Sequence, residues 1–170
     1  PASARHASGV MRRRRQDGAV LPLQLVILTA VRSSETLRAT WNEIDFSRKT
    51  WTIPAERMKA HREHRVPLST RAVELLKAME EVRENEYVFP GEPGHLSNMA
   101  MLALLKRMER TDITSHGFRS TFRDWTAERT NYPHEVCEMA LAHVVANQAE
   151  AAYRRGDLFD KRRQLMNAWA

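Results

Sequence analysis

The feature that most constrains the fold is a change of residue pattern at 41–68, between stretches with helical spacing. Short runs of β-branched and aromatic residues, at 50–53 and 64–68, replace the helical pattern there, and such runs are typical of β-strands. The segment at 43–46 is short and alternating, so three antiparallel strands are expected, with a longer loop at 54–63. The pattern therefore predicts a mainly α-helical domain with a small antiparallel β-sheet, an α+β fold.

Apolar residues at helical spacing cover most of the remaining chain. Two helical pieces are expected at 19–40, with Ser33 or Ser34 as the N-cap of the second and Glu35 in its first turn. The other expected helices lie at 69–84 after Ser69, from Ser97 through Met108, at about 115–130, from Pro133 to about Leu141, from Gln148 to about Arg155, and at 158–169. The apolar stripe on the last helix must be buried, either on its own domain or on a neighbouring protomer.

The helix that follows Ser97 is expected to bury one apolar set. That set is Met101, Leu102, Leu104, Leu105 and Met108. The helix is assigned to core packing.

Length and composition bound the class of protein. The 170 residues suffice for one domain with a proper core, which we place at 19–170 after a basic linker or arm at 1–18. We expect a piece of a longer protein, because the chain opens on a linker-like segment without Met. No apolar run is long enough for a membrane span, and no signal peptide is found. A single cysteine, Cys137, favours a reducing compartment, so a cytoplasmic, nucleoid-associated location is expected.

Clustered positive charge points to a polyanionic partner. The net charge is +6 and the isoelectric point is about 10.0, and residues 1–15 hold five Arg without an acidic residue. A second cluster lies at 57–71, where five basic residues face Glu63 alone. Such clusters favour nucleic acid, although a solvated basic arm would have the same composition.

The stretch from Thr114 to Tyr153 carries the most specific pattern of polar residues. His116 and Arg119 are three residues apart, which puts them on one face at the start of a helix capped by Thr114 or Ser115. The N-terminal N–H groups and the helix dipole point the same way, so this is a site for an anionic oxygen, most naturally a phosphate. Leu-Ala-His follows at 141–143, and Tyr153 comes ten residues after His143.

This order of residues resembles the catalytic domain of a tyrosine recombinase of the phage-integrase type. Two earlier positions fit the same family. Arg32 follows Ala30 where the family has Thr-Gly-x-Arg or Thr-Ala-x-Arg, and Lys59 precedes a His-x-Val-Pro-Leu run in the expected hairpin loop. The resemblance covers nearly the whole chain from about residue 20. Any one of these positions alone would be a weak signal, whereas six in order are specific.

The resemblance implies a role for each of the six positions. Arg32, with Glu35 as its buttress, and Arg119 would neutralise charge on the phosphate oxygens, and Tyr153 would attack the phosphorus to form a 3′-phosphotyrosyl linkage. Lys59 is the candidate general acid. His116 would accept a proton or donate to the phosphate, and His143 would be a second donor. Tyr87 and Tyr132 are competing tyrosines that have structural surroundings instead.

The expected partner is double-stranded DNA that carries attachment sites, cut and rejoined without a metal or other cofactor. The expected DNA contacts are Arg57, Arg62, Arg65, Arg154 and Arg155. A homotetramer on DNA is expected through the helix at 158–169. Two incomplete metal-ligand pairs, His61 with His64 and His134 with Cys137, lack further ligands. The alternatives are a catalytically silent DNA-binding remnant of an integrase and strand cleavage and religation like that of a type IB topoisomerase.

Overall fold

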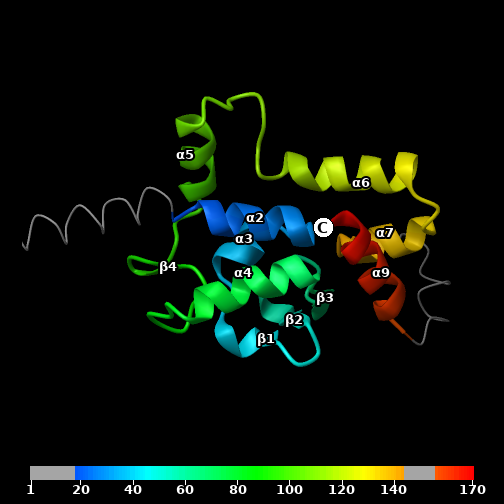
Figure 1. Cartoon of the computed structure of the whole chain (residues 1–170), viewed down its shortest axis with the longest axis horizontal. Helices are drawn as coiled ribbons and strands as arrows, with labels where there is room; N and C mark the ends of the chain where they lie inside the picture. Colours follow the sequence, from blue (N-terminus) through cyan, green and yellow to red (C-terminus); the bar gives the residue numbers. More distant parts are fainter. Residues whose placement is uncertain (1–17, 144–155) are drawn as a thin grey trace, which may run out of the picture.

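The computed structural model describes residues 18–143 and 156–170. Helices dominate it, and a small antiparallel sheet lies at one edge, below α4 and α2 in the view of Figure 1, so the expected fold class is confirmed. The elements are α2 (Val20–Thr29), α3 (Ser33–Leu37), η1 (Trp41–Glu43), β1 (Ile44–Asp45), β2 (Thr50–Ile53), η2 (Ala55–Arg57), β3 (His64–Pro67), α4 (Thr70–Glu80), β4 (Pro90–Gly91), β5 (Gly94–His95), α5 (Ala100–Arg107), α6 (Gly117–Arg129), α7 (His134–Ala140) and α9 (Phe159–Trp169).

The three expected strands form one antiparallel sheet, and their order in it is β1-β2-β3. Trp51 in the central strand pairs with Ile44 on one side and Val66 on the other. Ile53 at the end of β2 pairs with His64 at the start of β3, so the loop that contains Lys59 connects these two strands. A second, two-residue hairpin of β4 and β5 was not expected from the sequence.

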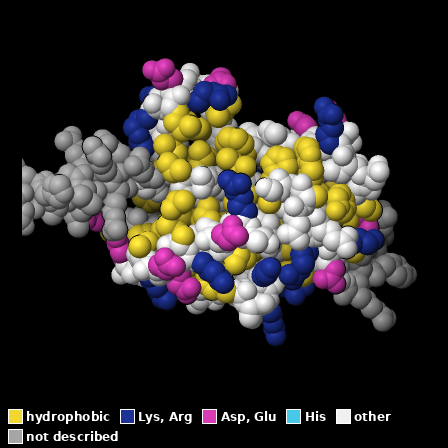
Figure 2. All heavy atoms as spheres, in the orientation of Figure 1, with side chains coloured by type: hydrophobic (Ala, Val, Ile, Leu, Met, Phe, Trp, Pro, Cys, Tyr) yellow, Lys and Arg dark blue, Asp and Glu magenta, His cyan; other side chains and the backbone are white. Residues whose placement is uncertain are grey.

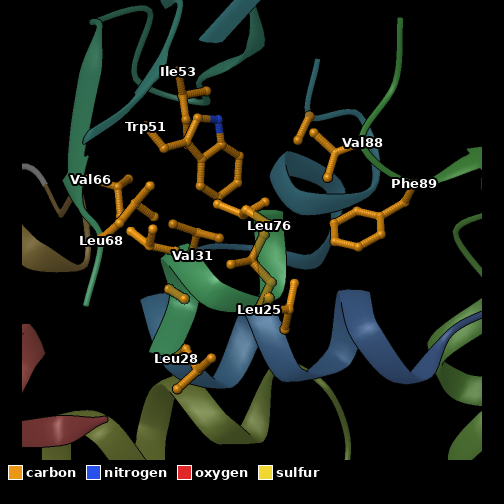
Figure 3. Packing of buried hydrophobic residues seen from close by; sticks show 14 of the residues in the cluster. Leu25, Leu28, Val31, Trp51, Ile53, Val66, Leu68, Leu76, Val88 and Phe89 are labelled. Carbon is orange, nitrogen blue, oxygen red and sulfur yellow. The ribbon is translucent and has the colours of Figure 1, made fainter. Parts of the chain in front are cut away.

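Helix α2 is the centre of the fold. Most of its residues are buried and no polar face separates them, as expected for a helix enclosed on all sides. Leu25 and Leu28 pack with the sheet and α4, as Figure 3 shows for Trp51 of β2 and its neighbours. Leu23 and Val26 join a second cluster with α5. The chain leaves the helix at Ala30, which belongs to a third cluster with α6, α7 and α9.

The last helix packs on its own domain. Leu165 and Met166 of α9 are buried against α6 and α7. The Trp169 ring lies 5.3 Å from Phe122 and 5.1 Å from Trp125, both measured between centroids, and its Nε1 donates to the Ile27 carbonyl at 2.6 Å. The apolar stripe of this helix was expected to be buried either on its own domain or on a neighbouring protomer. In the structure it is buried on its own domain.

Helix α5 differs from its expected form. It begins at Ala100, and the side-chain oxygen of Ser97 accepts instead from the amide of Met99 at 3.1 Å, so the expected cap is wrong. Leu102 and Met108 are 43% and 58% exposed, so the expectation that they lie inside is also wrong.

The face drawn in Figure 2 carries both signs of charge. Lys and Arg side chains alternate there with Asp and Glu, while hydrophobic side chains gather near α2 and α5. Charge alone therefore does not identify a DNA-binding surface on this face. Within 18–143 and 156–170, no helix is both long and apolar enough to cross a lipid bilayer.

Candidate active site

Arg119 is the buried centre of the candidate site. It lies in the first turn of α6 and is only 5% exposed. Its Nη1 donates to the Ala30 carbonyl and its Nη2 to the Leu141 carbonyl at 2.7 Å. Ala30 and Leu141 are the C-cap residues of α2 and α7, and helix C-termini attract cations. One guanidinium therefore donates to the C-cap carbonyls of two helices.

The surroundings of Arg119 lower its pKa. Burial is the main cause, the charge of Arg32 adds to it, and Glu35 opposes it, so the pKa of Arg119 is lowered from 12.5 to about 10. The side chain still carries its charge at neutral pH. A guanidinium has five N–H donors, so donors remain for an anion beside the two carbonyls. Because the geometry is set by the protein, an arriving phosphate would meet an oriented cation.

Arg32 is the N-cap residue of α3, and Glu35 holds it in two ways. The Glu35 carboxylate accepts from the Arg32 backbone amide and from its Nη1, each at 2.8 Å. The expected pairing of Glu35 with Arg32 is therefore confirmed, whereas the expected cap at Ser33 or Ser34 is wrong. Glu35 is buried while the Arg32 side chain is 26% exposed, so the guanidinium is tethered yet reaches solvent.

His143 joins this group just beyond the end of α7. Its amide donates to the Glu138 carbonyl at 2.9 Å, and Ala142 has a left-handed φ of 50°, which is the pattern of a Schellman helix end. The Nδ1 of His143 lies 2.8 Å from Glu138 Oε2, and its Nε2 lies 3.4 Å from Arg119 Nη2. Glu138 was not singled out from the sequence, because a contact across five residues at a helix end depends on the left-handed turn between them.

His116 and Lys59 occupy exposed positions. Helix α6 begins at Gly117, two residues beyond the predicted start at about 115, and His116 is its N-cap residue. The Thr114 hydroxyl accepts from the Gly117 amide at 3.1 Å. His116 and Arg119 therefore share the start of a helix, but only Arg119 is buried. Lys59 is exposed in the loop between β2 and β3. The structure brings Arg32, Arg119 and His143 together and leaves His116 and Lys59 at the surface.

The arginines expected to contact DNA differ in their surroundings. Arg57 Nη2 donates to Glu43 Oε2 at 2.8 Å and to the Glu35 carbonyl at 3.2 Å. Trp51 Nε1 donates to the same Glu43 oxygen at 2.9 Å. Burial lowers the pKa of Arg57, and the charges of Glu43 and Glu35 oppose that effect. Arg57 thus ties the start of the Lys59 loop to the residue that holds Arg32.

Arg62 and Arg65 are both exposed, but their contacts differ. Arg62 lies in the loop before β3. Arg65 forms a forked ion pair with Asp157 at 2.8–3.0 Å and lies over the Phe159 ring. Arg62 is therefore the better candidate for a DNA contact. Tyr153, Arg154 and Arg155 lie outside the described residues, so their predicted roles stay predictions.

Two further buried groups complete the surroundings: Arg162, which the sequence did not single out, and His64, which the sequence offered only as part of an incomplete metal-ligand pair. Arg162 of α9 is 2% exposed and donates to the Arg65 carbonyl and to Asp157, both at 2.7 Å. It thereby fixes the chain directly after the segment that carries Tyr153. His64 of β3 is 8% exposed. Burial is the main cause that lowers its pKa from 6.5 to about 4, and the charges of Arg162, Arg119 and Arg32 add to it.

The incomplete metal-ligand pairs gain no third member in the structure. Among the described residues, no cluster of three or more His, Cys, Asp or Glu side chains is arranged to hold a metal ion. His134 instead lies 3.9 Å from Glu138, and Cys137 is buried in the core.

Comparisons with known proteins identify the family of the chain. The model of the phage integrase family matches residues 10–157. The chain is 38% identical over 149 residues to the prophage integrase IntA of Escherichia coli K12, covering 85% of this chain and 36% of IntA. It is 33% identical over 170 residues to the integrase of Enterobacteria phage P4, covering 88% and 39%. It therefore spans less than two fifths of the length of these relatives.

Solved structures share the fold. An integrase from mycobacterium phage Brujita superposes with a TM-score of 0.70 at 18% identity, over 94% of this chain and 56% of that one. XerA recombinase gives a TM-score of 0.61 at 14% identity, over 92% and 60%. Because the family model spans most of the chain, including the helices that bring Arg32, Arg119 and His143 together, this chain belongs to the phage integrase family.

Proposed function

We propose that this chain is the catalytic part of a site-specific DNA recombinase, which cuts and rejoins strands through a 3′-phosphotyrosyl intermediate. The observation that carries the proposal is the convergence of Arg32, Arg119 and His143, with Arg119 held by 2.7 Å and 3.4 Å contacts to Leu141 and His143. Three groups that can donate to one anion from three separate elements suit a phosphodiester. Membership of the phage integrase family supports DNA as the substrate.

The proposed step is balanced without a redox partner or a nucleotide. The Tyr153 oxygen attacks the phosphorus and loses its proton to His116, while the bond from phosphorus to the 5′ oxygen breaks and Lys59 supplies a proton to that oxygen. Arg32 and Arg119 offset the charge on the non-bridging oxygens. The ester keeps the energy of the broken bond, so reversal by another 5′ hydroxyl rejoins DNA without ATP. These roles assume that the segment carrying Tyr153 and the loop carrying Lys59 close on the bound phosphate.

Assembly on DNA is a separate part of the proposal. Two duplexes must be cut and exchanged, which supports a homotetramer. If α9 is exchanged between protomers, the contact of Trp169 with Ile27 is broken within the chain and remade by the same groups between protomers. The contact of Arg162 with Asp157 joins residues five apart and can stay within one chain.

A trapping assay tests the proposal. The protein is mixed with nicked duplexes, of randomised sequence around the nick, from which the cleaved 5′ end diffuses away, and a denaturing gel then separates any protein–DNA adduct. We expect an adduct with the unaltered protein and none with Tyr153→Phe, which should still bind DNA. An adduct that survives Tyr153→Phe would move the nucleophile elsewhere. With intact duplexes, religation of each cut strand to its own partner and never across two duplexes would favour the topoisomerase alternative. Absence of any adduct would favour the DNA-binding remnant.

A further inference from the structure

Glu138 connects His143 to the body of the domain and is itself well enclosed. Its side chain is 16% exposed, against 38% for His143 and 55% for Arg123. One carboxylate oxygen lies 2.8 Å from His143 Nδ1, and the other accepts from Arg123 Nε at 3.0 Å. Burial raises the pKa of Glu138, but the hydrogen bonds from Arg123 and His143 outweigh burial and lower it overall, so the group is a carboxylate at neutral pH.

An ionised carboxylate only accepts hydrogen bonds. The Nδ1 atom of His143 must therefore carry a proton, and the Nε2 atom faces Arg119 at 3.4 Å. In the neutral ring that nitrogen accepts from Arg119, and in the imidazolium it becomes a second donor.

We propose that Glu138 is a positioning residue for strand cleavage, which holds the Nδ1 proton of His143 and so orients Nε2 toward the phosphate bound by Arg119, to which the doubly protonated ring donates. This inference rests on the proposed function. The same logic operates wherever a carboxylate fixes the tautomer and orientation of a functional imidazole. Glu138 itself does not touch the DNA.

Other charged groups surround this pair on each neighbouring element. Arg119 and Arg123 come from α6, and His134 lies on α7 at 3.9 Å from Glu138. Arg32 at the start of α3 is close enough to affect Arg119, and the neutral His64 of β3 lies near both arginines. The alternative is a purely structural role, in which Glu138 only connects α7 to α6 through Arg123. The two roles predict different results for Glu138→Ala and Arg123→Gln.

The first measurement is the single-turnover rate of adduct formation. Glu138→Ala should lower that rate about 10-fold to 100-fold, the usual cost of losing the partner of a functional imidazole. Arg123→Gln is the matched control, because it removes the other partner of Glu138 and leaves the contact with His143. It should weaken folding as Glu138→Ala does, yet change the rate by less than about threefold, as for an exposed pair. Equal loss in both variants would overturn the inference.

A double-mutant cycle and a pH profile separate positioning from folding. In a His143→Ala background, Glu138→Ala should cause no further loss of rate, since the two residues act as one unit. Glu138→Gln keeps an oxygen that accepts from Nδ1 but loses the charge. Glu138→Gln should recover part of the rate. As pH rises, the activity of this variant should begin to fall at a lower pH than that of the unaltered protein. Additive losses, or profiles that coincide, would contradict the inference.

The position of the proton can be measured without DNA cleavage. Long-range nitrogen–proton NMR correlations should report a proton on Nδ1 of His143 in the unaltered protein and a gain of the Nε2–H form in Glu138→Ala. An unchanged tautomer would sink the inference while the adduct assay stands. Conversely, the absence of any Tyr153-dependent adduct with the expected tautomer present would sink the proposed function and leave the Glu138 contact intact.

Discussion

The guanidinium of Arg119 donates to the backbone carbonyl of Leu141 at 2.7 Å, across 22 residues of sequence. The same side chain donates to Ala30, 89 residues away. Arg119, which we propose binds phosphate, thus also connects α2, α6 and α7. We therefore expect a substitution at this position to affect both stability and phosphate binding.

Arg119→Lys should damage both properties. A lysine ammonium lacks the planar fork that reaches two carbonyls at once, so we expect a loss of about 2 kcal/mol in unfolding free energy, from weakened charge-assisted hydrogen bonds. Adduct formation should fall about 10²-fold or more, as when one preorganised donor is lost. Urea unfolding and the trapping assay measure the two effects. His116→Gln is the control, because that exposed side chain should affect the adduct alone.

Ala142→Gly should stabilise the protein. Ala142 has a left-handed φ of 50° at the end of α7, where a Cβ is unfavourable and glycine is not. We expect a gain of about 1 kcal/mol in unfolding free energy. Ala140→Gly is the matched control, because it lies two residues earlier inside the helix and should cost about 0.5–1 kcal/mol. The same sign for both variants would refute the argument.

Arg57→Gln should destabilise the fold more than Arg62→Gln. Arg57 is paired with the enclosed Glu43, and its loss leaves that carboxylate with the Trp51 hydrogen bond but without its cationic partner, at a cost of about 2 kcal/mol. Arg62 is exposed, so its replacement should change stability by less than about 0.5 kcal/mol. If Arg62 contacts a phosphate, Arg62→Gln should reduce the salt slope of DNA binding by about one. Full stability with weaker DNA binding in Arg57→Gln would contradict this expectation and support the prediction that Arg57 contacts DNA.

His64 should make stability depend on pH in mildly acidic solution. Its pKa falls from 6.5 in the unfolded chain to about 4 in the fold, so below pH 6.5 the unfolded state binds the proton first. Stability is fully present above pH 6.5 and declines as pH falls toward 4, by up to about 3 kcal/mol. The difference between the unaltered protein and His64→Gln isolates this effect, because the other histidines cancel. A difference that is constant between pH 7 and pH 5 would contradict it.

Truncation before α9 should unfold the domain rather than only prevent association. Leu165 and Met166 are buried, and Trp169 packs on Phe122 and Trp125. The milder change Trp169→Ala should cost about 3 kcal/mol as a large-to-small substitution. Thermal unfolding measures the loss, and Lys161→Ala on the exposed face of α9 is the control. If the truncated protein keeps its melting temperature and loses only its assembly on DNA, α9 belongs to the partner protomer.

Within the described residues, the sequence predicted the elements well where the signal is local. Periodicity located the described helices and the three strands, and the spacing of His116, Arg119 and His143 led to the family. The helix expected from Gln148 to about Arg155 lies outside the described residues. Helix boundaries were less exact, as at Ser97 and Ser33, because a capping side chain competes with nearby backbone partners. Neither the burial of Arg119 nor the exposure of Leu102 was visible in the local pattern.

The sequence by itself determined the fold class, the order of the elements and the residue types available for the chemistry, because those depend on local preferences and on spacing along the chain. Tertiary structure alone decided how each arginine is used. Arg57 forms an ion pair with Glu43 and Arg65 with Asp157, whereas Arg119 donates to the carbonyls at two helix ends, although all three are the same residue type. Their partners lie 14 to 92 residues away, and only the packing of the helices around α2 brings such groups within hydrogen-bond distance.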